Sequence, residues 1–110
     1  MSELREKAEK ALDFLASTDL SHAQAKAKLS ALQEHRKTVK AAVYVDCVNA
    51  GKAQGLAEQL AYCSEKYREI IEQIEAAEID AIHLTNKRKR AELTIEIYRT
   101  ESANSRRGNV

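Results

Sequence analysis

Two pairs of residues place a carboxylate and an imidazole one helical turn apart: Asp19 with His22, and Asp80 with His83. Pairs at this spacing on facing helices hold metal in di-iron bundles, where inward-pointing glutamates bridge the two ions. The glutamates near these pairs fall largely outside the apolar positions, and Asp19 is more simply an acid in the first turn of a helix, where the helix dipole favours it. We therefore expect no metal and no cofactor.

Positive charge gathers toward the C-terminal end of the sequence. Residues 87–110 hold seven Lys or Arg against three acidic residues, whereas residues 1–86 hold 11 against 14. A basic cluster can contact a phosphate backbone, but four consecutive residues on a helix point in four directions. Ion pairs with nearby acids are the alternative use of these charges. The candidate nucleic-acid contacts are Lys87, Arg88, Lys89, Arg90, Arg99, Arg106 and Arg107.

Motifs for other chemistry are absent from the sequence. It has no Gly-rich phosphate loop, no Cys-x-x-Cys pair and no plausible Ser, His and Asp set, so we predict that it is not an enzyme. Cys47 and Cys63 do not make a disulfide framework, and we interpret Cys63 as a buried, inert thiol. The charged residues 2–7 are unlike a secretory signal, and the longest apolar run, Ala41–Val45, is far short of the roughly 20 residues of a membrane helix. We expect a cytoplasmic protein.

Composition and periodicity predict long helices. There is no Pro, and good helix formers dominate. Apolar residues recur at alternating steps of four and three, the pattern of a coiled-coil seam, first from Leu4 to Ala50 and then from Leu56 to Tyr98. We predict helices at about 3–16, 19–50 and 53–103 in one domain, 1–103, with a disordered basic tail at 104–110. Two alternatives stay open: a first half that is one continuous helix, and a break at Cys63–Glu65 with Ser64 as the N-cap.

Reversal of the chain at Gly51–Gly55 sets residue i opposite residue 106 − i. The seam residues then meet in pairs that include Val43 with Cys63, Val39 with Tyr67, Leu32 with Ile74, Leu15 with Ala91 and Ala11 with Ile95. The predicted fold is an all-α, elongated antiparallel helical hairpin, coiled-coil-like, with a short N-terminal helix. Arg88, the one polar seam residue of the second half, falls opposite Thr18 and beside Asp19. We expect these residues to form a polar layer that fixes the register.

A second apolar stripe lies on the predicted third helix, away from the seam. Its members are Ile79, Ile82, Leu93 and Ile97. A helix that is apolar on two sides usually has two neighbours. We therefore predict a homodimer or higher oligomer that buries this stripe in a bundle. The alternative is a compact three-helix monomer in which the first helix covers it.

The end of the sequence carries a recognisable pattern: Tyr98-Arg99-Thr100, a short gap, Ala103-Asn104, and then Arg106-Arg107-Gly108-Asn109. It resembles the C-terminal segment of small helical proteins encoded by bacteriophages and prophages, although Tyr98 stands where that group has Trp. The resemblance is close over about the last 25 residues and implies a phage-derived protein of the bacterial cytoplasm, of unassigned activity. It carries over no catalytic or ligand residue.

These observations favour a non-enzymatic, self-associating helical adaptor or structural protein of phage or prophage origin, which contacts other phage or host proteins. The rival hypothesis is an accessory nucleic-acid-binding protein of phage replication or recombination.

Overall fold

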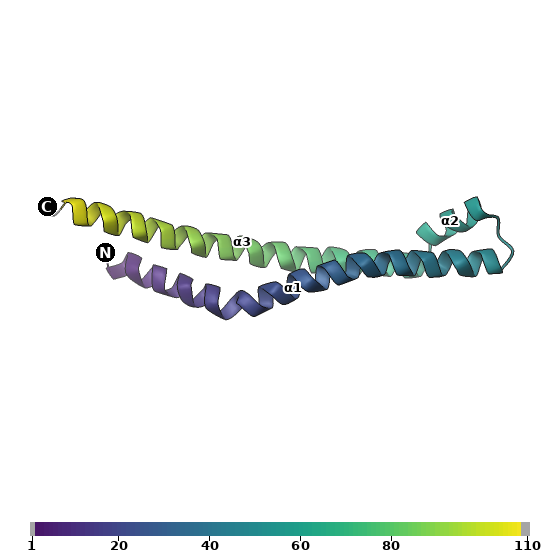
Figure 1. Ribbon diagram of the computed structural model, residues 1–110, viewed down its shortest axis with the longest axis horizontal. Helices are drawn as coiled ribbons and strands as arrows, with labels where there is room; N and C mark the ends of the chain where they lie inside the picture. The colour runs from purple at the N-terminus through teal and green to yellow at the C-terminus, as the bar shows by residue number, and fades with distance from the viewer. Residues whose placement is uncertain (1, 109–110) are drawn as a thin grey trace. The chain divides into compact units, whose positions relative to one another are not determined.

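The computed structural model describes residues 2–108 and places nearly all of them in three helices (Figure 1). Helix α1 spans Ser2–Asn49, α2 spans Gln54–Tyr62 and α3 spans Glu65–Gly108. No strand occurs within residues 2–108. The chain is therefore all-α, and α1 and α3 run antiparallel, as the sequence predicted. It divides into two compact units, which are described in turn.

The first unit comprises Met1–Gln24 and Ile82–Val110, so that it pairs the start of α1 with the end of α3. Its core is a small cluster of the buried residues Ala11, Ala91 and Ile95, against which Phe14 and Leu15 pack. This cluster contains both members of two pairs that the 106 − i rule predicted, Ala11 with Ile95 and Leu15 with Ala91.

The second unit, Ala25–Ala81, contains the rest of α1, all of α2 and the start of α3. The seam of α3 supplies the buried residues Ile70, Ile74, Ala77 and Ala81, and α2 supplies Ala57 and Ala61. The facing seam residues of α1 from Ala25 to Val43 are half-buried. Val39 and Ile70 line the same surface groove, one turn from the predicted pairing of Val39 with Tyr67.

The chain reverses after α1 through a glycine-dependent helix end. The amide of Lys52 donates to the carbonyl of Cys47 at 3.0 Å, and the amide of Gly51 donates to that of Val48 at 2.9 Å. This pair of hydrogen bonds is the Schellman motif, whose C′ residue adopts a left-handed backbone that glycine tolerates best. Gly51 has a φ of 89°. The predicted turn at this glycine is confirmed.

A second break separates α2 from α3 at Ser64. Its hydroxyl accepts a hydrogen bond from the amide of Tyr67 at 3.2 Å, which is N-cap geometry, and donates to the carbonyl of Ala61 at 2.8 Å. The alternative break at Cys63–Glu65 is therefore correct, and the prediction of one helix from residue 53 to 103 is wrong.

The break at Ser64 also displaces the predicted seam before Tyr67. Leu56, Leu60 and Cys63 are exposed, because α2 turns Ala57 and Ala61 inward in their place. Cys63 is exposed in the connection between α2 and α3, so the prediction that this thiol is buried is wrong. Cys47 is half-buried, and both thiols are free.

The predicted break at Ser17–Asp19, and with it the short N-terminal helix, is also wrong. The hydroxyls of Ser17 and Thr18 donate back to the carbonyl of Phe14, at 3.2 and 2.6 Å, so they bond within the helix and do not cap a new one. Helix α1 is continuous. At the other end α3 extends to Gly108, so residues 104–108 are helical where a disordered tail was predicted. The rest of that tail lies outside the described residues.

Candidate interaction surfaces

In the first unit, Arg88 forms the predicted polar layer between α3 and α1. One guanidinium nitrogen of Arg88 donates to the backbone carbonyl of Leu15 at 2.8 Å and to the hydroxyl of Thr18 at 2.7 Å. The other lies 3.7 Å from the carboxylate of Asp19. The Arg88 side chain is 15% exposed, whereas the Asp19 side chain is 84% exposed. The buried guanidinium is therefore hydrogen-bonded mainly by the neutral Leu15 carbonyl and Thr18 hydroxyl, and the carboxylate contributes less. The prediction that Arg88 meets Thr18 and Asp19 is confirmed.

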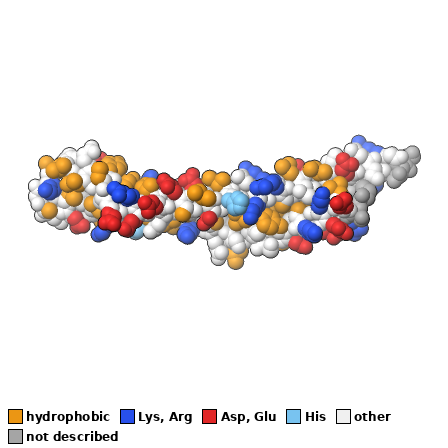
Figure 2. Space-filling model, turned by 180° about the vertical axis from the view of Figure 1, so that it is seen from behind, with side chains coloured by type: hydrophobic (Ala, Val, Ile, Leu, Met, Phe, Trp, Pro, Cys, Tyr) orange, Lys and Arg blue, Asp and Glu red, His pale blue; other side chains and the backbone are white. Residues whose placement is uncertain are grey.

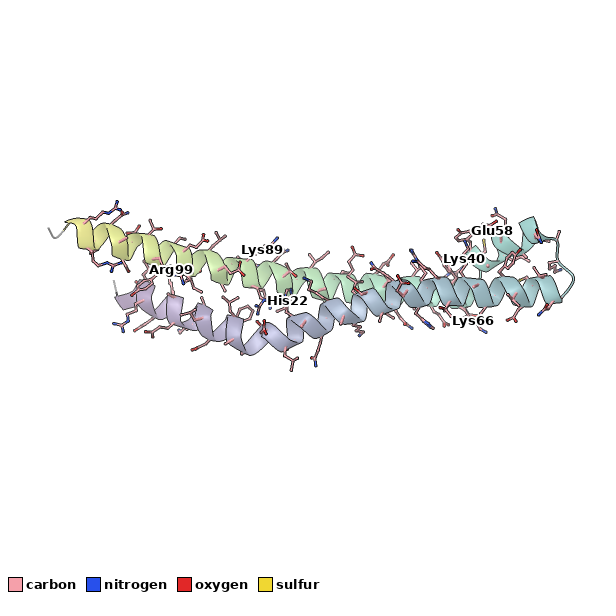
Figure 3. All side chains as sticks on the ribbon, viewed as in Figure 1. His22, Lys40, Glu58, Lys66, Lys89 and Arg99 are labelled. Carbon is pink, nitrogen blue, oxygen red and sulfur yellow. The ribbon has the colours of Figure 1, made fainter. Side chains whose placement is uncertain are left out.

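The two acid–imidazole pairs are not brought together as a metal site. His22 points from α1 toward α3, where its Nε2 and the Thr85 hydroxyl are hydrogen-bonded at 2.8 Å (Figure 3). Asp19 is engaged with Arg88, and both Asp80 and His83 are exposed. Within residues 2–108, no group of three or more His, Cys, Asp or Glu side chains is placed to hold a metal ion. His22 instead adds a polar contact one turn from the Arg88 layer.

The structure spreads the candidate nucleic-acid contacts around α3. Arg88 is turned inward, and the other six, Lys87, Lys89, Arg90, Arg99, Arg106 and Arg107, are exposed. Lys89 and Arg99 leave the helix in different directions (Figure 3). On the face seen in Figure 2, basic side chains are interspersed with acidic ones. These residues therefore do not form one flat basic patch.

The second apolar stripe of α3 is exposed at every member. In the first unit Ile82, Leu93 and Ile97 are 51%, 56% and 54% exposed, and Ile79 in the second unit is exposed as well. The opposite side of α3 carries Ala91 and Ile95, which α1 covers. Helix α1 thus leaves the stripe uncovered in the first unit. We call the residues Ile82, Leu93 and Ile97 the outer stripe.

A shallow depression lies on the outer stripe of α3, lined by Leu93, Glu96, Ile97, Thr100 and Glu101. It combines an apolar floor with two carboxylates, and it is open to solvent. This composition suits the docking of another helix, whose side chains fill such holes between neighbouring residues.

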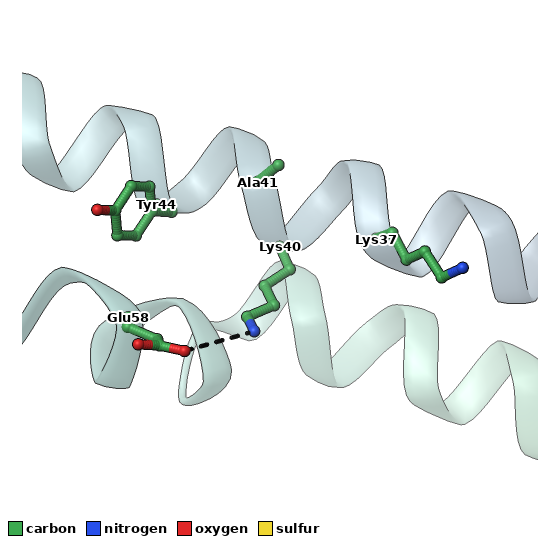
Figure 4. Close-up of a pocket in the computed structure, with 5 residues that line it drawn as sticks. All are labelled: Lys37, Lys40, Ala41, Tyr44 and Glu58. Carbon is green, nitrogen blue, oxygen red and sulfur yellow. Dashed lines mark ion pairs between the residues drawn. The ribbon is translucent and has the colours of Figure 1, made fainter. Parts of the chain in front are cut away.

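A second surface, which the sequence did not predict, surrounds Lys40 in the second unit. The Lys40 ammonium donates a hydrogen bond to the Tyr62 hydroxyl and lies 3.8 Å from the centre of the Tyr62 ring. It is 3.9 Å from the Glu58 carboxylate (Figure 4). Tyr62 also packs edge-on against Tyr67, with ring centres 5.6 Å apart. The hydrogen bond to Tyr62 is the main cause that raises the pKa of Lys40 above its ordinary value of 10.5, opposed by partial desolvation.

These contacts attach α2 to α1, and they border a surface cavity lined by Lys37, Lys40, Ala41, Tyr44 and Glu58 (Figure 4). The same unit exposes several apolar side chains: Val45 and Val48 of α1, and Leu56, Leu60 and Tyr62 of α2. The one hint of this surface in the sequence was the candidate N-cap at Ser64. A helix break there makes α2 a separate helix, which then packs on α1 through contacts that the seam period does not predict.

The chain is therefore an all-α helical hairpin. Its described residues include exposed apolar side chains, and they form no metal site. Comparison with family models, with curated proteins and with solved structures found no match. None of the helices in the described part of the chain has the length and apolar content to cross a membrane.

Proposed function

We propose that the protein is a non-enzymatic, self-associating helical adaptor that acts through protein contacts. The observation that carries this proposal is the exposure of the outer stripe. Three large apolar side chains stand more than half exposed on the face of α3 opposite the one that α1 covers. Exposed apolar side chains that line up along a helix are typical of a surface that another chain covers. The resemblance of the C-terminal segment supports a phage or prophage origin and a place in the bacterial cytoplasm.

Concentration-dependent stability tests self-association. Because folding that is coupled to dimer formation obeys mass action, the urea midpoint of the wild-type chain rises with protein concentration. Ile97→Asp places a charge in the outer stripe and removes this dependence. Leu20→Asp is the matched control, since Leu20 is a similarly exposed apolar residue of the same unit, 67% exposed, on α1. Its midpoint keeps the dependence. A wild-type midpoint that is constant over a hundredfold range of concentration contradicts the proposal.

Nucleic-acid binding is the second candidate function. The exposure of six basic residues between Lys87 and Arg107 favours it, because none of the six is in an ion pair within the described chain. Their spread around α3 argues against a single duplex-binding face. The number of phosphates contacted at once is therefore small, and affinity depends on salt only moderately.

The test is a salt titration of binding to a duplex and to a single strand. Loss of affinity with rising salt, reduced in Lys89→Ala/Arg90→Ala, supports this second function. No binding at low salt removes it and leaves the adaptor proposal in place.

A further inference from the structure

We infer that α3 pairs with α3 of a second copy in the antiparallel sense, centred on the outer stripe between Leu93 and Ile97. This inference rests on the proposed self-association and adds to it the partner element, the orientation and the charges that select both. It follows from the order of charges along the borders of the stripe.

The borders of the outer stripe carry opposite charges at its two ends. Lys89 and Arg90 precede Leu93, whereas Glu96 and Glu101 follow it. All four side chains are exposed, and within residues 2–108 none of them is in an ion pair. The stripe therefore runs from a basic end to an acidic end and has no partner of its own for either charge.

Helix geometry assigns these charges to two borders. Lys89 and Glu96 are separated by about two helical turns, so they lie along one border of the stripe. Arg90 and Glu101 are separated by about three turns and lie along the other border.

A two-fold axis perpendicular to both helices brings each border against the same border of the partner and reverses its direction. Lys89 then faces Glu96 of the second copy, and Arg90 faces Glu101 of the second copy, each twice by symmetry. An axis near Thr94 serves both pairs, because these long side chains span an offset of about one turn. The same axis lets Leu93 of each copy enter the depression that Leu93, Ile97 and Thr100 line on the other.

A parallel arrangement has the opposite electrostatics. It sets the basic ends side by side and the acidic ends side by side, and like charges on facing borders are destabilising. The distribution of charge thus selects the antiparallel pair, while the apolar side chains supply the attraction.

Charge exchange tests the orientation. In Lys89→Glu/Arg90→Glu both borders become acidic throughout, and in Glu96→Lys/Glu101→Lys they become basic throughout. Each double variant should dimerise at least about tenfold more weakly than the wild-type chain in low salt, because four facing pairs change from attractive to repulsive. A 1:1 mixture of the two variants should form a heterodimer, and the chain with all four substitutions should recover the wild-type dimerisation constant within about threefold.

The readout is mass by sedimentation equilibrium, with helicity by circular dichroism as the check that each variant folds. If the wild-type chain dimerises and both double variants dimerise equally strongly, this inference alone is contradicted. That result indicates a parallel pair, in which like charges face each other in the wild-type chain and in the variants. Weak double variants without recovery in the fourfold variant also contradict it. A wild-type chain that stays monomeric contradicts the proposed self-association itself.

Discussion

Replacement of Arg88 by methionine tests the polar layer that links the two helices of the first unit. Methionine keeps most of the apolar stem of the side chain and removes the guanidinium. The variant loses the hydrogen bonds to the Leu15 carbonyl and the Thr18 hydroxyl, the second of which is 2.7 Å long. A hydrogen bond from a charged donor contributes about 1.5–3 kcal/mol to stability, after allowing for the bonds that both groups make to water in the unfolded chain.

Two effects reduce the cost of Arg88→Met below the sum of those bonds. The guanidinium no longer has to be desolvated, and the Thr18 hydroxyl keeps its bond to the carbonyl of Phe14. We expect Arg88→Met to lower the free energy of unfolding by about 1–3 kcal/mol. Asp19→Asn should change it by less than about 0.5 kcal/mol, because this carboxylate is largely exposed and 3.7 Å away.

The assay is urea unfolding followed by circular dichroism at one protein concentration, with the slope of the transition checked for constancy. A double-mutant cycle of Arg88→Met with Thr18→Val isolates their contact and should give a coupling energy of about 1 kcal/mol. A coupling energy near zero, or a loss in Asp19→Asn equal to that in Arg88→Met, would refute the reasoning. The first result would show that the Thr18 contact contributes nothing, and the second that the exposed ion pair dominates.

Three further predictions concern the connections between helices. Gly51→Ala should destabilise the protein by about 1–2 kcal/mol in urea unfolding, because the backbone at Gly51 is left-handed. Gly55→Ala should stabilise it slightly in the same assay, because Gly55 lies in the first turn of α2 and an added Cβ has nothing within 4 Å. Ser64→Ala should cost about 1 kcal/mol through loss of the N-cap of α3, and a small change or a gain in stability would contradict that role. Because the pKa of Lys40 is raised in the folded state, its contribution to stability is present below pH 10.5 and is lost as pH rises through the higher folded pKa. Tyr62→Phe should lower the Lys40 pKa in an NMR titration, and an unchanged pKa would contradict the hydrogen bond as the cause of the shift.

Much of the first unit could be predicted from sequence because its seam is local and regular. A steady alternation of four- and three-residue steps fixes which face of each helix is covered, and one glycine turn then fixes the register. The burial of Ala11 and Ile95 in one cluster and the position of Arg88 both follow from that arithmetic. A single polar residue in an apolar seam must find acceptors on the facing helix, which is why the Arg88 layer was predictable.

The helix boundaries were harder to predict because a capping residue has two uses. Thr18 and Ser64 are both good N-cap types, yet Thr18 bonds back into a continuous helix while Ser64 begins α3. The apolar spacing does not separate the two cases, since Leu56 and Leu60 keep the seam period although α2 is a separate helix. Helix α2 buries Ala57 and Ala61 instead, and periodicity alone does not reveal which face of this short helix is covered.

The surface around Lys40 could not be predicted for the same reason. Its contacts join residues of α1 and α2 whose positions depend on the turn at Gly51 and the cap at Ser64 together. The outer stripe, by contrast, was visible in the sequence as a second period on one helix, and its exposure agrees with that interpretation.

The mass of the wild-type chain in solution, measured by sedimentation equilibrium across a wide range of concentrations, bears most directly on the proposal of self-association. We predict a rise from the monomer mass of 12.3 kDa toward twice that value as concentration increases. A mass that stays at 12.3 kDa even at the highest concentration would contradict it.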